Sequence, residues 1–147
     1  MALFRQPNLL YHCPKLLIAQ HESFLKSVIV ITWNNVKVFE NLVIKEGDNI
    51  ANVMMNLINY NNGCITVTRE YQTKNRKNAQ KNTIVLIFDE IFSGFRTGIS
   101  CAQGYYGVTP DICTLEKAIS NGIPNSVLAG RKTILSSNYT ARPPGYS

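Results

Sequence analysis

The sequence predicts an α/β fold in which helices flank a mainly parallel sheet. Short apolar runs at 28–33, 83–88 and 126–129 have the length and the β-branched content of buried strands. Segments whose apolar residues recur at helical spacing lie between these runs. Strands that alternate with helices are joined by crossover connections, and such connections produce parallel pairing.

Length and composition are those of one globular domain. The chain has 147 residues, of which 45% are hydrophobic and 16% charged, so it carries too much apolar material for intrinsic disorder. No apolar run approaches the roughly 18 residues that a membrane-spanning helix needs. We expect a poorly defined segment over 1–27, the domain over 28–135 and a flexible tail over 136–147, in a protein of the cytoplasm or, as a minor option, an organelle.

The first elements are a strand over 28–33 and a helix that follows it. Asn34 and Asn35 offer an N-cap, and the helix ends near Gly47 because its apolar positions recur at helical spacing only up to that residue. The next apolar run, 50–58, is interrupted by three asparagines, which weakens the prediction of a strand. The segment 64–80 shows no clean period, so strand, exposed helix and loop stay open there.

The run 83–88, Thr-Ile-Val-Leu-Ile-Phe, is the strongest strand signal in the chain. A strand that is apolar on both faces belongs in the middle of a covered sheet. Asp89 and Glu90 follow it directly, and open α/β sheets bind their ligands at the carboxyl ends of their strands. Asp89 is therefore a site candidate from the pattern alone.

The remaining elements are shorter. Ranges in chain order are a loop of small residues over 93–98, a helix over 101–106, a turn at 109–110, a strand over 111–114, a helix over 115–121 and a strand over 126–129. Gly122 is predicted to end the last helix in the left-handed conformation.

Charge is uneven along the chain. The formal net charge is +6, which favours anionic partners without naming one. Five cations and the single acid Glu70 fall between Arg69 and Lys81. This basic cluster is typical of a solvated face. Nucleic acid is not favoured as a partner, because Tyr71 is the only aromatic residue within the cluster.

The four cysteines predict neither a disulfide framework nor a zinc site. They form no Cys-x-x-Cys pair and have no histidine at ligand spacing. Cys113 is most simply a small core residue. We predict no metal site.

Three linked blocks carry a resemblance to a known family. They are IFDEIFSGFR at 87–96, AQGYYGVTPD at 102–111 and TLEKAISNGIP at 114–124. Together they resemble class III aminotransferases that depend on pyridoxal 5'-phosphate, and most of all the branch similar to glutamate-1-semialdehyde 2,1-aminomutase. The distance from Asp89 to Lys117, 28 positions (117 − 89), suits that branch. The resemblance is close over 83–132 and looser over 33–55.

The resemblance implies a fold, a cofactor and roles for three residues. The chain would be part of the large domain of a fold-type I enzyme. Asp89 would pair with the protonated ring nitrogen of pyridoxal phosphate, Ile91 would pack on the ring, and Lys117 would be the catalytic residue that forms the Schiff base. The implied reaction moves an amino group between a small amino donor and a carbonyl acceptor, in a homodimer and away from any membrane.

The same residues also admit structural roles. Asp89 could cap the turn that follows it, Lys117 could be a solvated lysine, and Arg96 could serve the site or merely the surface. Tyr105 and Tyr106 are expected to pack rather than to contact a cofactor.

The chain also departs from the family pattern. Asn56-Leu57 replaces a Glu-Pro pair, and Glu116 replaces a glycine, so that its charge could crowd Lys117 and raise its pKa. No phosphate cup of the Ser-Gly-Thr-Glu-Ala kind is found upstream, and no second lobe follows 131–132. We therefore expect weak or no activity from this chain alone. The alternatives are a non-catalytic truncated paralogue or interaction fragment and, less favoured, a basic RNA-binding module.

Overall fold

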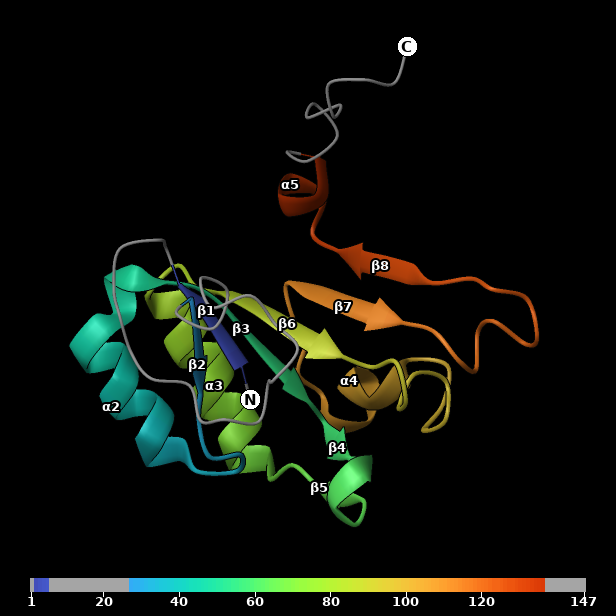
Figure 1. Ribbon diagram of the computed structural model, residues 1–147, viewed down its shortest axis with the longest axis horizontal. Coiled ribbons are helices and arrows are strands. Elements are labelled where there is room, and N and C mark those ends of the chain that lie inside the picture. The colour runs from blue at the N-terminus through green and yellow to red at the C-terminus, as the bar shows by residue number, and fades with distance from the viewer. Residues whose placement is uncertain (1, 6–26, 137–147) are drawn as a thin grey trace.

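Six strands form one mixed sheet in the computed structural model, which describes residues 2–5 and 27–136 (Figure 1). Its order is β2-β1-β3-β6-β7-β8, and β4 and β5 form a separate two-stranded sheet. The bounds are β1 Ala2–Arg5, β2 Val28–Val30, α2 Val36–Glu46, β3 Ile50–Asn56, β4 Ile58–Asn59, β5 Ile65–Thr66, α3 Arg69–Lys81, β6 Val85–Asp89, α4 Cys101–Tyr106, β7 Ile112–Leu115, β8 Val127–Gly130 and α5 Lys132–Leu135, with short 3-10 helices at Gly47–Asn49 and Tyr60–Asn62.

The centre of the sheet is parallel and its edges are antiparallel. β6 pairs in parallel with β3 on one side and with β7 on the other. β8 is antiparallel to β7, and β1 is antiparallel to both β2 and β3. The predicted α/β class is confirmed, as is the central place of the strand over 83–88.

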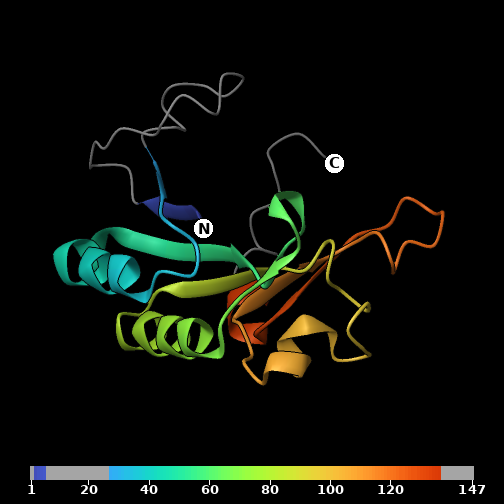
Figure 2. The same ribbon diagram turned by 90° about the horizontal axis from the view of Figure 1, so that it is seen from below.

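One core joins the helices to a single face of the sheet. Leu86 and Phe88 of β6 are fully buried, and they belong to the same cluster as Phe39 of α2, Tyr71 of α3 and Ala102 of α4. Figure 2 shows α3 and α4 on the same side of the strands. Residues of β6 that alternate with this buried set, such as Ile87, are only half-buried, so the sheet buries one face more completely than the other.

The helix after the first strand begins where the sequence predicts. The Asn35 side chain accepts a hydrogen bond from the N–H of Val38 at 3.3 Å, which caps α2. β3 also forms in spite of its asparagines. Its last residue, Asn56, finds polar partners at the end of the strand, and this removes the objection to an amide in that position.

The open segment 64–80 becomes α3. Thr68 caps this helix by accepting from the N–H of Tyr71 at 3.2 Å. The buried positions of α3 include Gln72 and Asn75 besides Tyr71 and Ala79. Two amides in the buried stripe hide its apolar periodicity, which explains why the sequence pattern left the segment undecided.

The helix predicted over 115–121 is wrong. β7 continues to Leu115, and the chain then passes through turns. Lys117 and Asn121 have φ angles of +46° and +42°, in the left-handed region that a right-handed helix does not contain. The left-handed conformation predicted for Gly122 is confirmed by its φ of +89°.

Two expectations fall mainly outside the described residues. The flexible tail predicted over 136–147 overlaps them only at 136, and the N-terminal segment over 1–27 overlaps them at 2–5, which form β1, and at 27. Within the described ranges, every helix is too short or too polar to cross a membrane.

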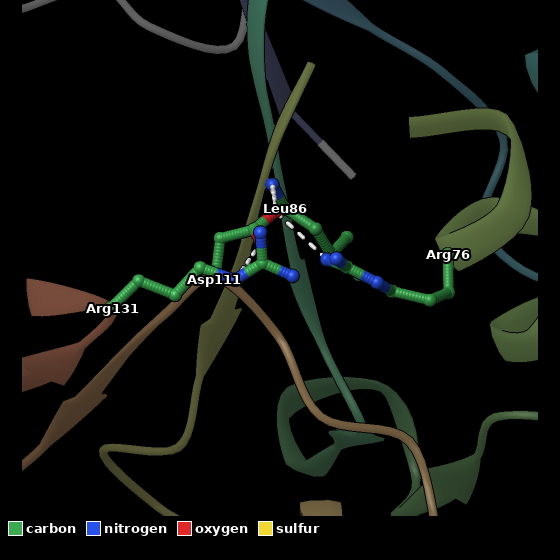
Figure 3. Close-up of polar contacts among 4 residues, drawn as sticks. All are labelled: Arg76, Leu86, Asp111 and Arg131. Carbon is green, nitrogen blue, oxygen red and sulfur yellow. Dashed lines mark hydrogen bonds and ion pairs between the residues drawn. The ribbon is translucent and has the colours of Figure 1, made fainter. Parts of the chain in front are cut away.

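Asp111 ties α3, β6 and β8 together at the amino end of β7. Its Oδ2 accepts hydrogen bonds from Arg76 Nη1 at 2.8 Å and from the N–H of Leu86 at 2.9 Å. Arg131 Nε lies 3.0 Å from Oδ1, so the two guanidinium groups approach from opposite sides (Figure 3). Burial acts to raise the pKa of Asp111, but the bonds from Arg76 and Leu86 and the two cationic charges outweigh it and hold the pKa below its ordinary value.

We predict that Asp111→Asn destabilises the protein in a way that depends on pH. Because the pKa of Asp111 is lower in the folded than in the unfolded chain, the carboxylate stabilises the fold above the unfolded value and loses this effect as pH falls through the folded value. The variant should lose about 2–3 kcal/mol at pH 7. This deficit should shrink below about pH 4. Urea unfolding of both proteins across this range measures it, and a deficit that does not change with pH would contradict the assignment.

Candidate active site

Three polar side chains meet at the carboxyl edge of the parallel strands. The register pairs Asn56 of β3 with Asp89 of β6, and Asp89 with Thr114 of β7. Since parallel neighbours in register point to the same face, these side chains lie side by side across the sheet. Thr114 received no site role from the sequence, although its position at the end of a strand next to Asp89 was the available signal.

The Asp89 carboxylate is oriented by its neighbours and has one oxygen available. Oδ1 accepts from the N–H of Ile91 at 3.1 Å and from Thr114 Oγ1 at 3.4 Å. Oδ2 has no hydrogen-bond partner among the described residues, and the residue is half-buried. The bond from Ile91 shows that Asp89 does cap the following turn, so its structural role and an available acceptor coexist.

Asn56 fixes the end of β6 from the neighbouring strand. Its Nδ2 donates to the backbone oxygen of Asp89 at 3.4 Å, and its own backbone oxygen accepts from Trp33 Nε1 at 3.1 Å. Leu57, the second residue of the Asn-Leu pair, is fully buried. The pair that departs from the family pattern therefore serves to hold the strand ends together.

Lys117 lies in the turn after β7 and extends over an aromatic ring. Its Nζ is 4.5 Å from the centroid of Phe92, within the range of a cation–π interaction. Phe92 belongs to the turn after β6 and also contacts Tyr60, with ring centroids 5.7 Å apart. The structure thus brings Lys117 back toward the turn that follows Asp89. The sequence reasoning missed Phe92, whose place three residues after Asp89 was the only hint.

Ile91 and Glu116 border a hollow beside this turn. The hollow has a volume of about 390 Å³, and Thr114, Leu115 and Val127 also line it. Glu116 is exposed, and no ion pair joins it to Lys117 among the described residues. The expected crowding of the lysine by Glu116 is therefore not a direct contact.

Glu90 organises the turn that carries Phe92. This side chain is fully buried. Its two oxygens accept from Ser93 Oγ at 3.1 Å and from the N–H groups of Ala102 and Gln103 at 2.6 and 3.0 Å. A buried carboxylate needs such donors, and here they anchor the start of α4 to the end of β6.

Gly94 lets this turn pack closely. A Cβ atom at this position would lie 2.7 Å from the backbone oxygen of Glu90 and 2.7 Å from Leu115 Cδ2. Both distances are far inside van der Waals contact, so the close approach of the turn to β7 requires glycine.

Three other residues named from the sequence have structural surroundings. Arg96 Nε donates to the backbone oxygen of Phe92 at 2.7 Å. Tyr106 packs against the core, as expected, whereas Tyr105 is 70% exposed and meets Tyr106 edge-on, so the expectation that Tyr105 packs into the fold is wrong. The reason is that α4 turns only one face toward the sheet.

Cys113 is buried in the core as a free thiol, which confirms its expected place. Burial raises the pKa of the thiol, and the hydrogen bond from Gln103 offsets this only in part. A thiol that stays protonated is a poor nucleophile, so Cys113 acts as a packing residue.

Comparison with known proteins identifies similar chains. The sequence profile of the family "Aminotransferase class-III" matches residues 6–142. Glutamate-1-semialdehyde 2,1-aminomutase of Methanobrevibacter smithii is 39% identical over 110 residues, which are 75% of this chain and 26% of that protein. The chain thus spans about a quarter of the length of this curated relative.

Solved structures show the same fold. An omega-transaminase from Sphaerobacter thermophilus superposes with a TM-score of 0.78 at 28% identity, over 88% of this chain and 30% of its own. A structure described as a transaminase with PLP bound gives 0.77 at 24% identity, over 97% and 32%. The cofactor predicted from the sequence, pyridoxal phosphate, is that of the family.

We predict that Gly94→Ala destabilises the chain by about 1–3 kcal/mol, because the added methyl group forces the 90–97 turn away from β7. Urea unfolding measures the loss. Thr97→Ala, at an exposed position of the same loop, is the control and should change stability by less than about 0.5 kcal/mol. Equal effects of the two substitutions would refute the packing argument.

Proposed function

Because the chain belongs to the class III aminotransferases, we propose that it binds pyridoxal phosphate through Asp89 and Lys117 for the movement of an amino group between an amino compound and a carbonyl compound. The observation that supports this most is the Asp89 carboxylate, held through Oδ1 with Oδ2 available, next to the strand that leads into Lys117. The similarity to an aminomutase of the glutamate-1-semialdehyde branch favours that branch of the chemistry.

The residues present fit the ring end of the cofactor. Asp89 offers an oriented acceptor to a protonated ring nitrogen, and a carboxylate in that place keeps the nitrogen charged. When bound, pyridoxal phosphate supplies a ring that accepts electrons from the substrate carbon. Thr114 and the N–H of Ile91 keep the carboxylate from rotating, so the acceptor is positioned before the cofactor arrives.

Lys117 is the group of this chain that can attack a carbonyl and then carry a proton. The amine must be neutral to act as a nucleophile. Phe92 fixes where the side chain rests, because its ring attracts the ammonium form at 4.5 Å. Loss of the proton releases the amine from this contact, and Lys117, which is exposed, can then reach toward Asp89 or the hollow beside Ile91.

The proposal extends to assembly and location. A homodimer in the cytoplasm, acting on a small amino donor and a small carbonyl acceptor, is what family membership supports. The same membership supports residues 28–135 as the domain unit, and the core cluster drawn from residues 31–115 lies inside it.

A non-catalytic interaction role is the second candidate. It is favoured by the exposure of Lys117 and Glu116, because a nucleophilic lysine is usually more desolvated. Cofactor attachment separates the two candidates.

We predict that the chain forms a covalent link to pyridoxal phosphate at Lys117. The visible absorbance of the lysine-linked cofactor should appear on mixing, and borohydride reduction followed by peptide mass spectrometry should place the label on Lys117. Lys117→Ala should abolish the signal, whereas Lys132→Ala, at another exposed lysine, should keep it. A label spread evenly over surface lysines would refute the site and leave the non-catalytic role.

We predict separately that Asp89→Asn weakens binding of pyridoxal phosphate by roughly tenfold or more, because a charge-assisted hydrogen bond to the ring nitrogen is lost. Titration of the lysine-linked absorbance measures the affinity. Asp48→Asn, an exposed carboxylate of a distant 3-10 helix, should leave it unchanged. The assignment of Asp89 would not survive an unaltered affinity in the first variant.

A further inference from the structure

A cavity of about 770 Å³ lies at the other end of β7 from Lys117. Its walls come from α3, from the end of α4 and the turn after it, and from β7 and β8. Residues that line it are Thr73, Arg76, Lys77, Gln80, Gln103, Gly107, Val108, Thr109, Pro110, Ile112, Cys113, Ala129, Gly130 and Arg131. Its volume is in the range of about 300–1,000 Å³ that is typical of small-molecule sites.

The lining is cationic. Arg76, Lys77 and Arg131 belong to it, and no acidic residue does. Asp111 lies behind the two arginines and offsets one of the three charges. Arg76 reaches Asp111 through Nη1 and Arg131 through Nε, and each guanidinium carries further N–H donors. Figure 3 shows the arginines arriving from opposite sides, so their remaining donors flank a common space.

The basic cluster found in the sequence contributes directly to this wall. Lys74 is paired with Glu70 at 2.9 Å, and Arg76 with Asp111 at 2.8 Å. Lys77 is exposed and has no ion-pair partner among the described residues. Since Lys77 lines the cavity, its charge is available to a ligand there.

The cavity also has an apolar part. Val108, Pro110, Ile112 and Ala129 belong to the lining, and Gln80 and Gln103 add two amides to it. A bare inorganic anion would leave the apolar surface in contact with water. An uncharged ring compound would leave the cations without a partner.

We propose that this cavity binds a small phosphorylated compound with a flat, largely apolar body, of which a nucleoside monophosphate is a suitable probe. The phosphate contacts Lys77 and the free donors of Arg76 and Arg131, while the ring packs against Pro110 and Ile112. Arginine and lysine are the residues that phosphate recognition employs. This site is distinct from the Asp89–Lys117 region, and the inference does not rest on the proposed cofactor chemistry.

The test is calorimetric titration of the chain with AMP, adenosine and inorganic phosphate. We expect saturable binding of AMP and at least tenfold weaker binding of adenosine and of phosphate. Lys77→Gln should weaken AMP binding by roughly tenfold, the loss of one charge-assisted contact. The matched control is Lys81→Gln, an exposed lysine of the same helix that does not line the cavity, and it should change the affinity less than twofold.

Two further variants distinguish binding in this cavity from binding at the Asp89–Lys117 region or loosely on the basic surface. Arg131→Gln should also weaken AMP binding, and a thermal melt shows whether the variant remains folded. AMP binding should persist in Lys117→Ala, because the cavity lies at the opposite end of β7. Absence of saturable AMP binding by the folded chain, equal binding of adenosine, or equal losses in Lys77→Gln and Lys81→Gln would each overturn the proposal.

Discussion

The parallel register of β3, β6 and β7 is the constraint on which the rest of the molecule depends. It aligns Asn56, Asp89 and Thr114 across three strands that are far apart in the sequence. A shift by one residue would turn Asp89 toward the helices and Phe88 toward the open face. The apolar side chains of β6 prevent that shift, because Leu86 and Phe88 are fully buried in the core. Core packing therefore positions the polar edge.

Two buried carboxylates secure the opposite ends of this parallel centre. Glu90 gathers Ser93 and the start of α4 at the carboxyl end, and Asp111 gathers Arg76, Leu86 and Arg131 at the amino end. A buried charge is tolerated only with partners, so each acid fixes the elements that supply its donors. The candidate active site lies beside Glu90, and the cationic cavity lies beside Asp111.

Family membership and local geometry agree at the ring-binding end of the site. Asp89 is oriented, and Lys117 is brought over Phe92 from the next strand. Where the chain departs from the family pattern, the substitutions have defined surroundings. Asn56 holds the end of β6, Leu57 is buried, and Glu116 is exposed and forms no ion pair with the lysine in the described part of the chain. These departures preserve the strand ends, so the region around Asp89 keeps its shape.

Much of the fold was predictable because its signals are local. The apolar run before Asp89 predicts a central strand whatever surrounds it, and Asn35 and Gly122 act on their own backbone neighbours. The signals failed where long-range contacts decide. α3 packs two amides inward, and the chain after β7 turns through left-handed residues at Lys117 and Asn121 although its pattern is typical of a helix.

By itself the sequence determined the α/β class, the central strand, the family resemblance and the candidates Asp89 and Lys117, since each follows from a contiguous pattern or from fixed spacing. Only the tertiary structure decided that Thr114 and Ile91 orient Asp89, that Phe92 receives Lys117, and that Arg76, Lys77 and Arg131 line one cavity. These groups come from separate elements, and strand register and helix packing alone bring them within contact distance.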